Sequence, residues 1–104
     1  MVRRGEVWWA EVPDTGRRPF LVMTRDAAIP VLNSVLVAPV TRTARGIPTE
    51  LPLSPDDGMP HECAATFDNL RVVHKAYLVG RITQLGPVRM HAASVAARLA
   101  LDCS

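Results

Sequence analysis

The sequence predicts a mainly β protein of the α+β class, a small barrel with one C-terminal helix, as a single domain over residues 1–104. Two continuous apolar runs of strand length, Pro19–Thr24 and Ser34–Thr41, indicate strands that are buried on both faces. Several shorter β-rich segments lie between turn-forming residues, and a helical pattern follows Gly86. Many short strands with one terminal helix are typical of a small β-barrel with a helical appendix.

Size and charge narrow the functional classes. With 104 residues, 48% of them hydrophobic, the chain can build one modest core. Its 12 Lys and Arg against 10 Asp and Glu give a formal charge of +2, which permits a nucleic-acid partner without requiring one. Most of the basic residues are arginine, whose planar guanidinium suits phosphate contact. No apolar run is long enough for a membrane span or a signal peptide, so a cytoplasmic protein without a membrane partner is expected.

The N-terminal half is expected to contain three strands, Gly5–Val12, Pro19–Thr24 and Ser34–Thr41. Pro13–Gly16 has the residue types of a tight turn. Asp26–Leu32 has room for one or two helical turns, limited by its proline. Pro39 lies inside the third strand, and because proline cannot donate to a ladder, it suggests an edge strand or a bulge.

The C-terminal half is expected to contain four further extended segments, Ile47–Leu53, Glu62–Phe67, Arg71–His74 and Tyr77–Leu85. Ser54–Pro60 is predicted to be a long loop, and Lys75–Tyr77 a helical turn.

One helix is predicted to start at Gly86-Pro87, because proline is well tolerated at a first helical position. Three rows follow at helical spacing: Val88, Ala92, Val95 and Leu99; Met90, Ala93, Ala97 and Leu101; and the polar His91, Ser94, Arg98 and Asp102. The two apolar rows are expected to pack on the sheet.

Two arginines precede the second strand, and a threonine ends the third. If these strands are antiparallel, the start of one meets the end of the other, which would place Arg18 beside Thr41 on one rim. Arg17, Arg42 and Arg45 would lie on the adjoining segments. Guanidiniums gathered on one rim repel one another unless an anion is bound there, so the pattern favours a phosphate site. Taken singly, each of these side chains is equally consistent with an ordinary solvated surface.

Other chemistries find little support in the sequence. His61 and Cys63 lack the further ligands that a metal site needs, and no nucleophile elbow, P-loop or dinucleotide fingerprint occurs, so neither a metal nor a cofactor is predicted. A loop histidine and a small core thiol explain the pair more simply, and Cys103 lies near the C-terminus. His74 and His91 could act as bases in RNA cleavage or could be merely solvated.

Neighbouring residues on a strand point to opposite faces, which bears on Trp8 and Trp9. We therefore expect one of the two tryptophans in the core. The other would lie on an interface or on a surface where a base could stack.

Five blocks carry a family likeness: Arg4–Ala10, Arg18–Val22, Val37–Thr41, Asp68–Arg71 and Gly80–Ile82, followed by an amphipathic helix. With the gaps between them, these blocks and the helix cover nearly the whole chain. In these features the sequence resembles the MazF/PemK family of toxin endoribonucleases, and especially its mycobacterial-type members.

The resemblance implies an SH3-like barrel of the MazF/CcdB type, a homodimer, and the toxin of a type II toxin-antitoxin system that inhibits translation and growth. It implies sequence-specific, metal-independent cleavage of single-stranded RNA by 2′-OH attack, leaving a 2′,3′-cyclic phosphate and a 5′-OH. The expected partner is a MazE-like antitoxin whose acidic tail occupies the RNA groove. The family's catalytic roles fall on Arg18 and Thr41, with Arg17, Arg42, Arg45 and Asn69 as RNA-binding candidates.

Two departures from the family stand out. Pro13–Arg17 is shorter than the Gly/Ser/Glu-rich loop common in the family, and Asn69 stands where glutamine is frequent. Two alternatives remain open at this point: a non-enzymatic CcdB-like toxin that binds DNA gyrase, and an RNA-binding barrel without catalysis.

Overall fold

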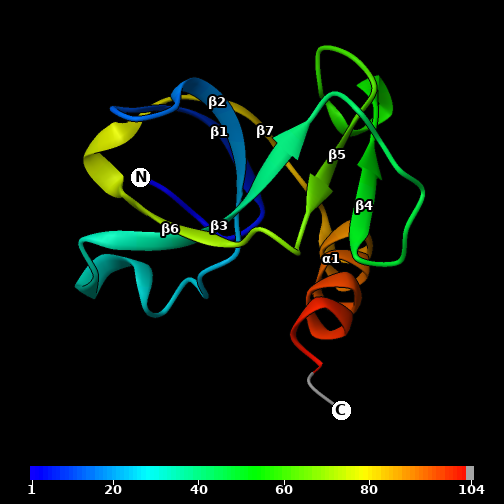
Figure 1. Ribbon diagram of the computed structural model, residues 1–104. Coiled ribbons are helices and arrows are strands. Elements are labelled where there is room, and N and C mark those ends of the chain that lie inside the picture. The colour runs from blue at the N-terminus through cyan, green and yellow to red at the C-terminus, as the bar shows by residue number, and fades with distance from the viewer. Residues whose placement is uncertain (103–104) are drawn as a thin grey trace.

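The computed structural model describes residues 1–102, which form seven strands, three short 3₁₀ turns and one α-helix (Figure 1). The strands are β1 (Glu6–Val12), β2 (Gly16–Val22), β3 (Ser34–Thr41), β4 (Glu50–Leu53), β5 (Cys63–Thr66), β6 (Arg71–His74) and β7 (Leu78–Gln84). The 3₁₀ turns are Ile29–Val31, Pro55–Asp57 and Lys75–Tyr77, and the helix is α1 (Pro87–Leu101). Each predicted strand has a counterpart, whereas Cys103 lies outside the described residues.

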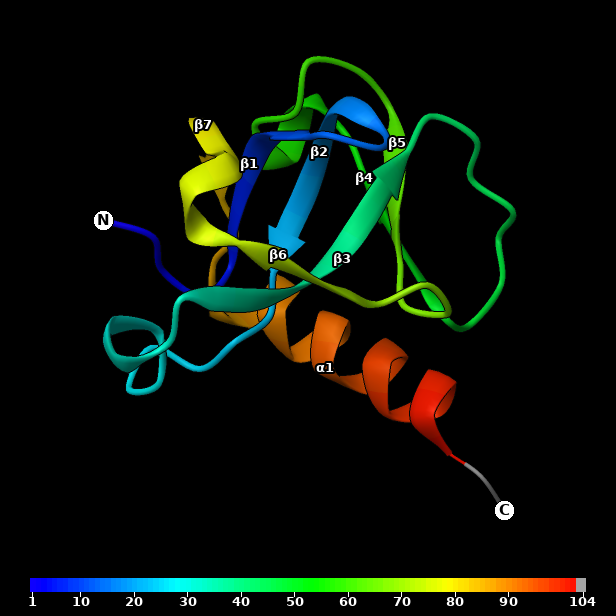
Figure 2. The same cartoon turned by 60° about the vertical axis from the view of Figure 1, so that its left-hand side comes forward.

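All strands pair antiparallel, in the order β4-β5-β3-β2-β1-β7, with β6 also paired to β3. The sheet curls into a half-barrel, and α1 runs along its base (Figures 1 and 2). β3 holds the fold together because its first half pairs with β6 and its last two residues pair with β5. The predicted SH3-like barrel with one terminal helix is confirmed.

The prediction that Pro39 marks an edge or a bulge was wrong. β3 is central, and Pro39 lies opposite Phe20 of β2 in a register without a shift. On the other side of β3, the pairing passes from β6, which ends opposite Val37, to β5, which begins opposite Val40. A residue without an N–H is tolerated there, because the ladder on that side is changing partner.

The core lies on both faces of the curled sheet. Leu21 of β2 packs toward the helix with residues of β1, β4 and β5, while Phe20 and Val22 pack into the curl with residues of β3 and β6. The prediction that this strand is buried on both faces is therefore confirmed. The strand begins earlier than predicted, at Gly16, because a tight hairpin turn pairs Gly16 with Val12 of β1.

The second apolar row predicted for the helix is confirmed in part, because Ala93 is buried and Met90 and Ala97 pack against the core. The first row was mostly wrong: Val88 is 82% exposed, Val95 and Leu99 are exposed as well, and Ala96, which belonged to neither row, is buried. α1 makes its main contacts with β4, and small side chains allow the two backbones to approach closely. Close approach thus outweighs side-chain size in choosing the buried face.

Arg4 and Gly5 join the helix to the start of the sheet. The Arg4 guanidinium donates to the Met23 carbonyl and, at 3.2 Å, to Ser94 Oγ on α1. Gly5 has φ +89°, and a Cβ there would lie 3.1 Å from Met90 Cγ on the same helix. Glycine is therefore required at this position, for its backbone conformation and for its lack of a side chain.

A polar cluster closes the open side of the half-barrel. Arg89 Nε of α1 donates to Asp57 Oδ1 at 2.9 Å, and a second nitrogen of Arg89 donates to the Pro52 carbonyl. Thr83 Oγ1 of β7 donates to the Asp57 carbonyl at 2.8 Å. The two ends of the sheet path, β4 and β7, are thereby tied together by one turn. Within residues 1–102, no helix has the length and apolar character needed to cross a membrane.

Candidate functional site

The register of the sheet brings Arg18 and Thr41 to one rim. β2 and β3 pair Phe20 with Pro39 and Leu21 with Ala38. Continuing this register by two residues on each strand puts Arg18 opposite Thr41, and residues directly opposite each other share a face.

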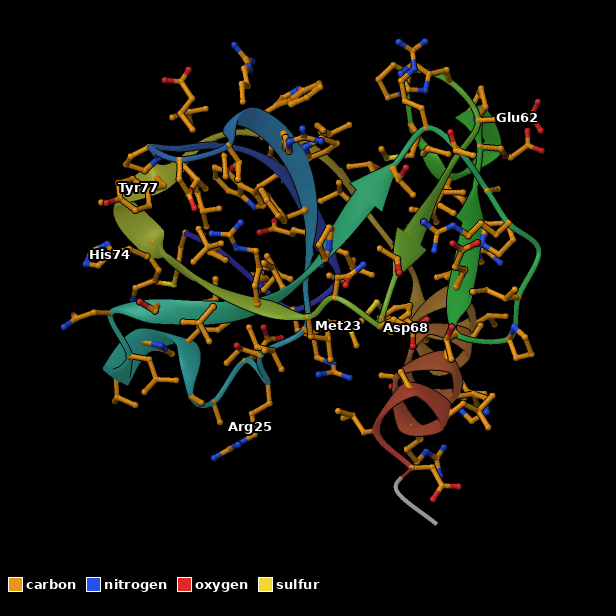
Figure 3. All side chains as sticks on the ribbon, viewed as in Figure 1. Met23, Arg25, Glu62, Asp68, His74 and Tyr77 are labelled. Atoms are coloured by element: carbon orange, nitrogen blue, oxygen red, sulfur yellow. The ribbon has the colours of Figure 1, made fainter. Side chains whose placement is uncertain are left out.

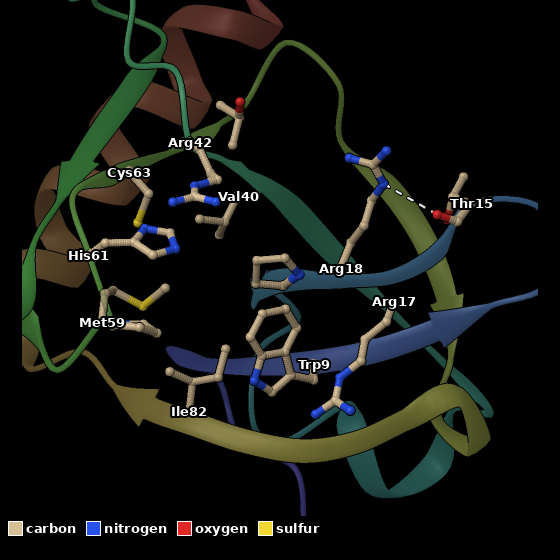
Figure 4. A pocket seen from close by; sticks show the side chains of 13 residues that line it. Trp9, Thr15, Arg17, Arg18, Val40, Arg42, Met59, His61, Cys63 and Ile82 are labelled. Carbon is tan, nitrogen blue, oxygen red and sulfur yellow. Dashed lines mark hydrogen bonds between the residues drawn. The ribbon is translucent and has the colours of Figure 1, made fainter.

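A pocket of about 320 Å³ opens at this rim. Figure 4 shows Arg17 and Arg18 on one wall and His61, Cys63 and Met59 on the other. The floor is apolar, formed by Trp9, Pro19, Val40 and Ile82. Since Val40 belongs to the helix-side core and Ile82 packs against it, the floor continues that core.

A second pocket, of about 170 Å³, adjoins the first and shares Arg18, Pro19, Val40 and Thr41 with it. Its remaining lining comes from β3, the loop after β3, the facing ends of β4 and β5, and the loop after β5, and comprises Pro39, Arg45, Glu50, Thr66 and Asn69. All six residues that the sequence singled out therefore line one pocket or the other: Arg17, Arg18, Thr41, Arg42, Arg45 and Asn69.

Both pockets carry a strong positive charge. Four arginines line them. Among the residues of the described range 1–102 that line either pocket, Glu50 is the one carboxylate. None of these arginines is within ion-pair distance of an Asp or Glu among residues 1–102. A concave site with low-dielectric walls concentrates such a field and attracts anions.

The two central side chains are only loosely held. Arg18 Nε donates to the Thr15 carbonyl at 3.4 Å, a long and exposed bond, and the guanidinium points away from the His61 wall (Figure 4). Thr41 Oγ1 accepts from the Thr43 N–H at 3.2 Å, which leaves its hydroxyl proton free to donate. Both groups can turn to an incoming anion at little cost.

The structure separates the two tryptophans as their positions on a strand require. Trp8 packs against the inner core cluster, and its Nε1 donates to Glu6 Oε1 at 3.0 Å. Trp9 lies in the pocket floor, and the guanidinium carbon of Arg17 stands 5.1 Å from its ring centroid. This cation–π contact holds Arg17 over an aromatic surface of the pocket.

Two residues of the pockets were missed by the sequence analysis. His61, interpreted there as a loop histidine, forms part of the first pocket, and its Nδ1 lies 3.2 Å from the Glu62 carbonyl. Glu50 lines the second pocket although it is only 6% exposed. A lone carboxylate at the start of a proline-interrupted strand was the only available signal for Glu50.

The remaining candidates are the thiol of Cys63, which is not activated as a nucleophile, and two histidines that line neither pocket. Cys63 is buried, and its burial, together with the negative charge of Asp57, raises the pKa of the thiol. His74 is at the end of the molecule away from Glu62 (Figure 3), its Nδ1 accepting from the Ala76 N–H, and His91 lines neither pocket. No group of three or more metal-ligating side chains occurs within residues 1–102.

Comparison with known proteins identifies the family. Residues 3–101 match the profile described as "PemK-like, MazF-like toxin of type II toxin-antitoxin system". The chain belongs to this family of toxins. It is 47% identical to "Probable endoribonuclease MazF5" of Mycobacterium tuberculosis over 102 residues, which is 97% of this chain and 94% of that protein.

Solved MazF-like structures share the fold over nearly the whole chain. The "Mycobacterium tuberculosis toxin MazF-mt6" superposes with a TM-score of 0.86 at 29% identity, covering 95% of this chain and 98% of the other. An "Endoribonuclease in complex with its cognate antitoxin from Mycobacterial species" superposes with a TM-score of 0.88 at 24% identity, covering 100% and 98%. The MazF-like family and fold predicted from the five sequence blocks are confirmed.

Proposed function

We propose that this chain is a cytoplasmic endoribonuclease toxin, a single domain over residues 1–104 that cleaves single-stranded RNA at short sequences without a metal ion. One observation carries the proposal. In a member of a family with relatives named as endoribonucleases, Arg18 and Thr41 lie opposite each other where two un-neutralised basic pockets meet.

The reaction needs little beyond positioning and charge stabilisation. The 2′-oxygen of a ribose attacks its own 3′-phosphate, the bond to the 5′-oxygen breaks, and a 2′,3′-cyclic phosphate and a 5′-OH result. Negative charge grows on the non-bridging oxygens, where fixed donors give the largest catalytic benefit. The positive Arg18 guanidinium stabilises this negative charge after turning from the Thr15 carbonyl, and the Thr41 hydroxyl donates a hydrogen bond to the same phosphate.

The apolar floor and the arginines around it bind the flanking nucleotides. Trp9 offers a ring on which a base can stack once Arg17 moves to a phosphate. Arg42 and Arg45 contact phosphates from the loop after β3, and the Asn69 amide reads a base edge. The short turn at Pro13–Thr15 leaves the groove open above Arg18, so specificity rests on these walls rather than on a lid.

The same charges explain the proposed partner. An acidic antitoxin segment would neutralise the four arginines and block the groove, and a related toxin has been solved with its cognate antitoxin. We propose a homodimeric toxin inhibited by such a segment of a MazE-like partner.

The decisive experiment incubates purified protein with a long single-stranded RNA in excess EDTA and then maps the ends. We expect cleavage at a recurrent short sequence, with 5′-OH ends and 2′,3′-cyclic phosphates. RNA that is bound but not cut would favour the non-catalytic RNA-binding barrel. Gyrase inhibition without RNA cleavage would favour the CcdB-like alternative, and cleavage abolished by EDTA would contradict the proposed mechanism.

A further inference from the structure

Two carboxylate side chains are buried within residues 1–102, and their hydrogen bonding differs sharply. Glu6, 3% exposed, uses both oxygens: Oε1 accepts from the Arg3 N–H at 2.7 Å and from Trp8, and Oε2 accepts from Arg81 at 3.2 Å. Glu50, 6% exposed, uses one: Oε1 accepts from the Arg45 N–H at 2.8 Å. Within residues 1–102, Glu50 Oε2 accepts no hydrogen bond and has no cationic partner.

A buried carboxylate is costly unless its oxygens are satisfied, so Glu50 calls for an explanation that Glu6 does not. Within residues 1–102, the one fully buried side-chain oxygen or nitrogen without a partner is Thr15 Oγ1, so the small exposed part of Glu50 includes Oε2. It lines the second pocket, whose other polar residues include Arg18, Thr41 and Asn69. The unused oxygen therefore belongs to a site that a ligand can enter.

Sheet register places Glu50 on the same face as the two proposed catalytic side chains. β4 and β5 pair Glu50 with Thr66, and β5 and β3 pair Ala64 with Thr41. Thr66 and Ala64 are two residues apart on one strand, so their side chains share a face. The same face continues to Arg18, opposite Thr41 on β2. Four adjacent strands thus contribute Arg18, Thr41, Thr66 and Glu50 to one surface.

We propose that Glu50 is the general base of the RNA cleavage reaction. This inference rests on the proposed endoribonuclease function. Oε2 of Glu50 takes the proton from the ribose 2′-OH as the 2′-oxygen forms its bond to phosphorus. The bond from phosphorus to the 5′-oxygen breaks, and that oxygen takes a proton from water. Glu50 then releases its proton to solvent, which restores the carboxylate for the next turnover.

Anchoring distinguishes Glu50 from the competing base, His61. The Arg45 N–H fixes one Glu50 oxygen and leaves the other directed to substrate, a preorganised arrangement typical of catalytic groups. His61 is more accessible, and its ring nitrogen Nδ1 contacts the carbonyl of the adjacent residue, Glu62. His61 forms part of the first pocket but not of the second, in which Glu50, Arg18 and Thr41 meet.

The test compares Glu50→Gln with His61→Gln in single-turnover cleavage of a mapped RNA between about pH 3.5 and 9, a range that includes the ordinary glutamate pKa of about 4.3 and the ordinary histidine pKa of about 6.5. Glutamine keeps an acceptor for the Arg45 N–H but cannot take the proton. We expect Glu50→Gln to lower the rate by about 10²–10⁴-fold and to abolish the rise in rate with pH on the acid side. His61→Gln should keep that rise. RNA carrying a 2′-deoxyribose at the cleavage site should bind wild type and Glu50→Gln within about 3-fold of each other.

The outcomes separate this inference from the proposed function. If wild type does not cleave RNA, the proposed function fails, and the inference fails with it. If wild type cleaves and Glu50→Gln stays within tenfold with an unchanged pH profile, Glu50 is not the base, and the endoribonuclease stands. If the acid-side rise is lost in His61→Gln instead, His61 is the base.

A second variant covers the case in which Glu50→Gln does not fold. Glu50→Asp keeps a carboxylate and shortens its reach by one methylene. We expect a rate loss of more than tenfold with the acid-side rise retained. An undiminished rate would overturn the proposal.

Discussion

Two groups of arginines in this chain have opposite surroundings. Arg4, Arg81 and Arg89, here called the anchored arginines, each donate to specific oxygens: Arg4 to Met23 and Ser94, Arg81 to Glu6, and Arg89 to Asp57 and Pro52. The rim arginines, Arg17, Arg18, Arg42 and Arg45, have no carboxylate within ion-pair distance in the described chain.

The contrast separates arginines whose contacts stabilise the fold from arginines whose charge is available to bind a ligand. The contacts of the anchored arginines are completed on folding and join β1, β7 and α1 into one unit. The rim arginines are left close together without counter-charges, which lowers the stability of the free protein and favours the binding of an anion. Such a trade of stability for activity is common at functional sites. The two groups should therefore respond differently to the same substitution.

The largest effect should come from the rim. Arg18→Ala and Thr41→Ala each remove one donor to the reacting phosphate, and we expect cleavage rates to fall by about 10²–10³-fold. The midpoint of thermal unfolding should stay the same or rise. Arg25→Ala, an exposed arginine that lines neither pocket, is the matched control and should cleave normally. A near-normal rate in either rim variant would remove that residue from the site.

The reverse pattern is expected for an anchored arginine. Arg89→Ala removes a two-pronged contact with Asp57 and leaves the half-buried Asp57 carboxylate without its cation. We expect the free energy of unfolding to fall by about 1–3 kcal/mol, measured by urea denaturation. Cleavage per folded molecule should be retained. A variant that is fully stable but inactive would show that the anchored and rim groups are not separate.

Sequence alone could predict the meeting of Arg18 and Thr41, because two apolar strands that follow one another in the chain usually lie side by side, and when they pair antiparallel the start of one meets the end of the other. It could not predict Glu50 in the same site. That placement depends on how β4 pairs with β5, which is set across the loops at 42–49 and 54–62 rather than by a local pattern.

Part of the helix face was mispredicted for a related reason. Hydrophobic periodicity favours the larger side chains, such as Val88 and Leu99, whereas the close contact with β4 selects alanines. The position of Pro39 likewise depended on a change of partner along β3, which no local pattern in the sequence encodes.

A smaller effect is expected from the outer rim arginines. Arg42→Ala should weaken RNA binding by a few-fold and reduce the slope of log K against log salt by about 0.7, the value for one single-strand phosphate contact. The measurement is a fluorescence titration at several salt concentrations with uncleavable 2′-deoxy RNA. Arg98→Ala, on the helix away from both pockets, should leave the slope unchanged. If the two variants lowered the affinity and the salt slope equally, RNA binding would depend on the overall charge and not on a contact made by Arg42.

The smallest effect concerns Cys63, which lines a pocket with rim arginines and is also affected by Asp57, the partner of an anchored arginine. The thiol faces the first pocket, yet burial and then the charge of Asp57, the partner of Arg89, raise its pKa above its ordinary value. A raised folded-state pKa gives stability that is complete below the unfolded pKa and is lost as pH rises toward the folded one. In a Cys103→Ser background, the free energy of unfolding should therefore decline above about pH 8.5, the unfolded thiol pKa, and less steeply after Cys63→Ala. Iodoacetamide should label native Cys63 much more slowly than the urea-unfolded protein. Rapid labelling at neutral pH would mean that the thiol is activated, and would return Cys63 to the list of candidate nucleophiles.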